Sequence, residues 1–99
     1  MEMNAIHNPA AARFEVLLGE GPARCEYRQV GPVLVLHHTE VPAALQGRGI
    51  AAVLVRAALD WARAQGLRVR PSCSYVAAYT RRHPDTHPLL ESPAAHTWP

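Results

Sequence analysis

The chain has 99 residues and a mass of 10.8 kDa, which is the size of a single domain. A hydrophobic fraction of 48% beside 18% charged residues indicates a globular protein rather than a disordered one. The net charge of +2 is too small to indicate nucleic-acid binding, and no apolar run approaches the roughly 20 residues of a membrane span. The first residues lack the pattern of a signal peptide, so we expect a cytoplasmic protein.

The first half of the sequence predicts an antiparallel sheet. Residues 1–11 show no clear period, so we expect a flexible lead-in there. Apolar residues alternate with polar ones over 14–18 and 23–28, which predicts two half-buried strands joined by a glycine-containing turn. A third strand is expected over 33–41, because an aliphatic run opens it and Pro42 stops its hydrogen-bond ladder.

The second half predicts a helix, a strand and a second helix. Apolar residues recur at helical spacing over 49–65, and Gly66 suits the end of that helix. A short strand is expected over 67–73, at a sheet edge because it contains Pro71. A helix over 75–83 follows, and residues 86–99 are expected to be a loose tail.

The predicted fold class is therefore α/β (α+β), with an antiparallel meander, a βαβ unit and a C-terminal helix over residues 12–85. Between the third strand and the first helix lies the sequence Gln46-Gly47-Arg48-Gly49-Ile50-Ala51. Glycines let the backbone approach a ligand, and the unpaired N–H groups of a helix start attract phosphate. Arg48 adds a charged donor, so this loop is a candidate site for a phosphate or pyrophosphate.

The Gln46-x-x-Gly49-x-Ala51 spacing resembles the signature of the GNAT N-acetyltransferase superfamily. The predicted order of strands and helices resembles that fold over residues 12–85. The stretches 38–41 and 71–75, with Tyr79 and the His83-Pro84 pair, are similar to a small single-domain branch of the superfamily. The chain has no room for the additional N-terminal helices and final strands of larger members, which usually help to shape the acceptor pocket.

The resemblance implies that the protein binds acetyl-CoA and transfers the acetyl group to an amine. It implies that coenzyme A lies between the ends of the two parallel strands, with its pantetheine arm paired to the strand backbone. The implied cofactor-binding residues are Thr39, Glu40, Val41, Gln46, Gly47, Arg48, Gly49, Ile50 and Ala51.

Four side chains are candidates for proton transfer or nucleophilic attack. Cys73 precedes a predicted helix, whose partial positive charge favours a thiolate, and it is either an acid or a nucleophile. Tyr79 is a second candidate, because the superfamily often uses a tyrosine of this helix to protonate the thiolate. His38 lies near the strand end and is a candidate base, because histidine is a common general base at neutral pH, and Glu40 is a further candidate base. Each of the four also has a purely structural alternative, such as a buried filler or a hydrogen-bonded strand residue.

Other functional classes stay open at this point. The two competing hypotheses are a coenzyme A-binding module without turnover and an adaptor domain whose glycine loop only starts a helix. Two cysteines and scattered histidines predict no metal site, and the expected reducing compartment disfavours a disulfide. Cys25 lies in mid-strand, far along the chain from the loop, so we expect it to be outside the site. The expected partners are acetyl-CoA and an amine, without nucleic acid or membrane, and a monomer is favoured.

Overall fold

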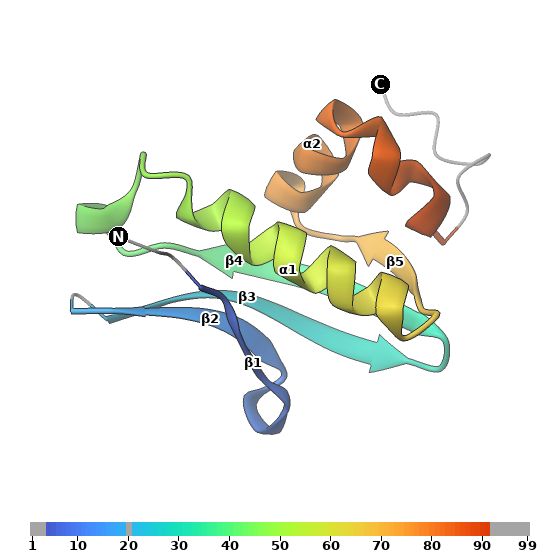
Figure 1. Cartoon of the computed structure of the whole chain (residues 1–99), viewed down its shortest axis with the longest axis horizontal. Helices are drawn as coiled ribbons and strands as arrows, with labels where there is room; N and C mark the ends of the chain where they lie inside the picture. The colour runs from blue at the N-terminus through green and yellow to red at the C-terminus, as the bar shows by residue number, and fades with distance from the viewer. Residues whose placement is uncertain (1–3, 20, 92–99) are drawn as a thin grey trace.

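The computed structural model describes residues 4–19 and 21–91 as a five-stranded sheet with helices packed on one face (Figure 1). The strands lie in chain order across the sheet: β1 (Ile6–Asn8), β2 (Arg13–Leu18), β3 (Gly21–Val30), β4 (Val33–Glu40) and β5 (Arg68–Pro71). The helices are α1 (Ile50–Ala64) and α2 (Ser74–Arg82), with 3₁₀ helices at Pro9–Ala11, Ala43–Leu45 and Pro84–Leu89.

The topology confirms the predicted fold class. Strands β1 to β4 form an antiparallel meander, and β5 then pairs in parallel with β4 after the chain has crossed the sheet through α1. The strand that contains Pro71 lies at the sheet edge, as its missing N–H predicts. No helix of the described residues is long and apolar enough to cross a membrane.

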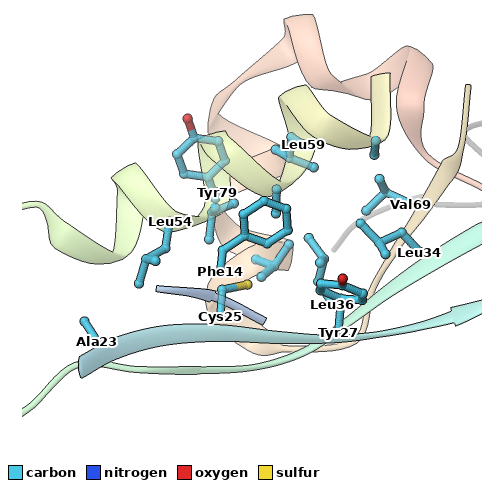
Figure 2. Close-up of a cluster of buried hydrophobic side chains, with 14 of the residues drawn as sticks. Phe14, Ala23, Cys25, Tyr27, Leu34, Leu36, Leu54, Leu59, Val69 and Tyr79 are labelled. Carbon is cyan, nitrogen blue, oxygen red and sulfur yellow. The ribbon is translucent and has the colours of Figure 1, made fainter. Parts of the chain in front are cut away.

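One continuous core lies between the sheet and the helices (Figure 2). Alternate residues of the strands point up into it, and α1 lays an apolar face against them, because the strand period is two and the helix period is 3.6. The buried side chains include Phe14, Val16, Cys25, Tyr27, Leu34, Leu36, Leu54, Leu59, Ala62, Val69 and Tyr79.

The opposite face of the sheet carries charged pairs instead of a helix. Arg13 pairs with Glu15 on β2, and the Arg24 Nε atom on β3 lies 2.7 Å from a Glu26 carboxylate oxygen. We call this surface the open face. Its carboxylates are paired with arginine side chains, including that of the buried Glu15, so these charges are satisfied by their neighbours on the sheet.

The expected flexible lead-in is wrong for the part that the structure describes. Residues 6–8 form β1, which pairs with β2. His7 stacks on Phe14 with ring centroids 4.4 Å apart, and its Nε2 atom lies 2.6 Å from the Tyr27 hydroxyl. Three residues are too few to show the two-residue period of a strand, so the sequence did not indicate β1. Residues 1–3 lie outside the described residues.

The expected loose tail is also wrong for residues 86–91. Leu89 and Leu90 are buried, Leu90 forms an isolated β-bridge with Val69, and the Glu91 N–H donates to the Val69 carbonyl at 2.9 Å. The density of proline suggested an irregular segment, yet Pro84 begins a 3₁₀ helix, where a missing N–H costs nothing. The remainder of the predicted tail, 92–99, lies outside the described residues.

The packing of Leu90 predicts a stability difference between two leucine variants. Leu90 is 1% exposed and Leu17 is 60% exposed. We expect Leu90→Ala to lower the free energy of unfolding by about 2–5 kcal/mol, because it opens a cavity in the core. Leu17→Ala should change it by less than about 0.5 kcal/mol. Thermal melts of both variants check this, and similar melting temperatures would show that residues 86–91 do not contribute to the core.

Candidate functional site

The parallel strands β4 and β5 part after four paired positions. Their register ends where Leu36 stands opposite Pro71, and the Leu36 carbonyl then accepts from the N–H groups of Ser72 at 3.1 Å and Cys73 at 3.0 Å. Beyond this point β4 continues to Glu40, whereas the segment after β5 turns away into α2. The result is a wedge between the end of β4 and the start of α2, where no strand of the described residues lies beside this edge of β4.

A bulge sets which side chains of β4 face this wedge. Tyr27 stands opposite Leu36 and Glu26 stands opposite His38, so His37 is one extra residue on β4. Without it, His38 and Glu40 would share the helix-facing side with Leu36. The extra residue instead turns Thr39 toward the helices.

The same bulge sets the direction of the backbone groups. Hydrogen-bonded and non-hydrogen-bonded pairs alternate in an antiparallel ladder. The Leu36 carbonyl points away from β3, toward β5. The bulge adds one residue to the alternation, so the N–H and C=O of Thr39 also point away from β3, at the uncovered edge of β4. An extended ligand in the wedge finds the hydrogen-bonding groups of an edge strand there.

The far end of the wedge is closed by the glycine loop. Gly47 and Gly49 have φ angles of +83° and +77°, a left-handed conformation that side-chain-bearing residues rarely adopt. Gly49 is the N-cap of α1 and supplies no side-chain hydrogen bond to the helix start, so the N–H groups of the first turn lie open. The Gln46 amide donates to the Val41 carbonyl at 3.0 Å, which ties the loop to the end of β4.

A cavity of about 260 Å³ lies at this loop. Its walls include most of the predicted cofactor-binding residues, and they add two that the sequence analysis missed, Leu45 and Tyr75. The lining residues are Val41, Leu45, Gln46, Gly47, Gly49, Ile50, Ala51 and Tyr75. Of the other predicted residues, Thr39 lies along the wedge, and Glu40 and Arg48 are exposed outside the cavity lining.

Glu40 and His38 lie on the open face, away from the cavity. The His38 Nε2 atom is 3.1 Å from a Glu40 carboxylate oxygen, and Arg24 reaches the same carboxylate at 3.2 Å. These contacts, with the His38 hydrogen bond first, lower the pKa of Glu40. The carboxylate is therefore ionised at neutral pH and already engaged with two partners, which explains its place without any role in the cavity.

The structure separates the two tyrosines of α2. The buried Tyr79 hydroxyl accepts from the Arg56 Nε atom at 2.9 Å, and its ring stacks on His83 with centroids 3.9 Å apart. Tyr75, one turn earlier, is 38% exposed and lines the cavity. The sequence prediction chose Tyr79, but Tyr75 is the tyrosine of α2 that the structure brings to the cavity. The position of Tyr75 in the first turn after β5 was the signal available for finding it.

The predicted catalytic Cys73 lies at the start of α2 and is partly exposed. Its Sγ atom donates to the Thr39 hydroxyl oxygen at 3.7 Å across the wedge. Cys25 stands opposite Thr39 on β3, so the sheet brings it next to Thr39 although it lies far along the chain from the loop. Both thiols are free. They flank β4 from either side, roughly 10 Å apart by strand spacing, which is beyond the about 7 Å that a disulfide spans.

Comparisons with known proteins agree with this geometry. The family model for the GCN5-related N-acetyl-transferases matches residues 13–89. Protein NATD1 of Homo sapiens is 44% identical over 59 residues, which are 59% of this chain and 52% of that protein. Protein NATD1 of Danio rerio is 40% identical over 63 residues, 63% of this chain and 56% of that protein. The chain thus spans about half the length of the curated relatives it matches.

A solved structure confirms the arrangement of the elements. The solution structure of a GCN5-like protein from Staphylococcus aureus superposes with a TM-score of 0.71, covering 89% of this chain and 87% of that one. The two sequences are 22% identical, so this match concerns the fold. The wedge, the uncapped helix start and the family match over residues 13–89 lead to one conclusion: the chain belongs to the GCN5-related N-acetyltransferase family.

Proposed function

We propose that the protein binds acetyl-CoA in the wedge between β4 and α2 and transfers the acetyl group to an amine. The observation that supports this most directly is the cavity at the start of α1, which has no side-chain cap. This cavity lies next to the uncovered edge of β4. A pyrophosphate at this helix start accepts from the free N–H groups of the first turn, and the helix dipole favours its charge. Arg48 stands in the same loop as a charged donor.

The edge of β4 suits the pantetheine arm, whose amides have one donor and one acceptor each. In this proposal they pair with the N–H and C=O of Thr39, as an added strand does. The thioester then lies toward the narrow end of the wedge, where Cys73 faces Thr39. The apolar wall of Val41, Leu45 and Ile50 excludes water along the arm.

Transfer requires two proton movements. The amine nitrogen attacks the thioester carbonyl and loses a proton, the carbon–sulfur bond breaks, and the departing thiolate gains a proton. Cys73 at the narrow end and Tyr75 at the cavity are the described groups placed to give that proton. Cys73 also has the chemistry of a nucleophile that is acetylated first and then gives the acetyl group to the amine, with the coenzyme A thiolate leaving.

A pair of variants of equal shape tests the cofactor site. Asp and Asn both tolerate the left-handed backbone of Gly49, and a Cβ at that position meets nothing within 4 Å. We expect Gly49→Asp to weaken coenzyme A binding at least about tenfold more than Gly49→Asn, because only Asp places a negative charge at the phosphate position. Calorimetric titration with coenzyme A measures this. Equal affinities in the two variants, with melting temperatures alike, would place the phosphates elsewhere.

A turnover assay tests the proposed acetyl transfer against the competing hypothesis of a binding module without turnover. Release of coenzyme A from acetyl-CoA is followed by chromatography with a polyamine, a lysine-containing peptide or a peptide with a free N-terminus as the acceptor. We expect Cys73→Ala to lower turnover about 100-fold while coenzyme A affinity stays unchanged. Comparing Tyr75→Phe with Tyr79→Phe shows which hydroxyl matters. Tight binding without turnover on any acceptor would favour the binding module.

A further inference from the structure

Three polar side chains line up across neighbouring strands on the helix-facing side of the sheet. Cys25 on β3 stands opposite Thr39 on β4, and Cys73 follows β5 on the far side of β4. The Cys73 thiol donates to the Thr39 hydroxyl at 3.7 Å. On the other side of Thr39, the cross-strand pairing places the Cys25 thiol within reach of the same hydroxyl, whose hydrogen bond lowers the pKa of Cys25. Thr39 thus lies between the two sulfur atoms, and Cys25 points into the core (Figure 2).

Cys25 is a buried thiol to which the proposed function assigns no role. Its side chain is fully shielded from solvent, and burial raises its pKa to about 11 even though the Thr39 hydrogen bond opposes that shift. At neutral pH the Cys25 sulfur therefore keeps its proton. Cys25 is consequently able to donate a hydrogen bond as well as to accept one.

The Thr39 hydroxyl has one proton and two lone pairs, so its direction depends on its neighbours. While the Cys73 thiol donates to it, the hydroxyl proton points at Cys25. If the Cys73 sulfur becomes negative, the hydroxyl proton turns toward that sulfur, and the Cys25 thiol donates to the hydroxyl oxygen. Every proton stays on its own atom, and the negative sulfur gains a hydrogen bond that is itself strengthened by a second one.

We propose that Thr39 and Cys25 form a hydrogen-bond relay that stabilises negative charge on the Cys73 sulfur. Both are positioning residues. The inference rests on the proposed function in one respect: that function supplies the reaction in which a negative charge on the Cys73 sulfur would be used. The charged and titratable side chains of this part of β3 and β4, Arg24, Glu26, His38 and Glu40, pair with one another on the open face. Support for the sulfur from the sheet therefore comes from the relay rather than from an ion pair.

Alkylation of Cys73 by iodoacetamide tests the relay without acetyl-CoA or an acceptor. The negative sulfur is the reactive form, and peptide mapping by mass spectrometry separates Cys73 from the shielded Cys25. We expect Thr39→Val, which keeps a β-branched strand residue, to slow alkylation of Cys73 about tenfold at pH 7. Thr39→Ser keeps the hydroxyl and should restore the rate to within about twofold of the natural protein.

The second arm changes the other end of the relay. Cys25→Ala removes the donor behind Thr39 and should slow alkylation of Cys73 about threefold, whereas Cys25→Ser keeps a donor and should not. This pair decides the matter if Thr39→Val fails to fold, which thermal melts will show. Equal rates in Cys25→Ala and Cys25→Ser, or an unchanged rate in folded Thr39→Val, would overturn the relay. A protein without turnover but with these rate differences would refute the proposed function alone.

Discussion

The extra residue His37 in β4 is the feature on which the rest of the site depends. A strand turns successive side chains to opposite faces, so one inserted residue exchanges the faces of everything that follows it. Upstream of the bulge, Leu34 and Leu36 belong to the core. Downstream, Thr39 takes the helix-facing side, and the imidazole and carboxylate of His38 and Glu40 go to the open face. The chemistry of the wedge is therefore one of thiols and hydroxyls.

The second constraint is the early end of β5. Pro71 has no N–H, and the two N–H groups that follow it both go to the Leu36 carbonyl. That carbonyl is thereby saturated, the parallel ladder ends, and α2 begins with Cys73 as its N-cap. Because α1 and α2 share one core with the sheet, the uncovered edge of β4 is held open by packing on both sides.

The local parts of this architecture could be predicted from the sequence, because they depend on neighbours in the chain. The period of α1, the glycines of the loop and the edge position of the Pro71 strand all follow from short-range rules. The structure agrees with each of them.

What sequence reasoning missed depends on register and on tertiary contact. Nothing local to Cys25 indicates that it stands opposite Thr39, because an unbulged ladder would pair it with His38. Whether Tyr75 or Tyr79 reaches the cavity depends on the rotation of α2 about its axis, which is set by packing against α1. The Arg56 guanidinium, 23 positions away in sequence, decides where the Tyr79 hydroxyl goes. Likewise, Leu90 is recognisable as a core residue only once Val69 lies beside it.

The two faces of β4 carry different side-chain chemistry beside the proposed ligand site. On the open face, Arg24 bridges the carboxylates of Glu26 and Glu40 and fixes the ends of β3 and β4 together. Exposed pairs of this kind add little stability singly, but they keep long side chains ordered on a solvated surface. On the helix-facing side, a neutral thiol, a hydroxyl and a second thiol satisfy one another without charge. A buried charge there would need a partner that the core does not provide, whereas a polarisable relay allows negative charge to arise only at the rim, on Cys73, where the wedge is open.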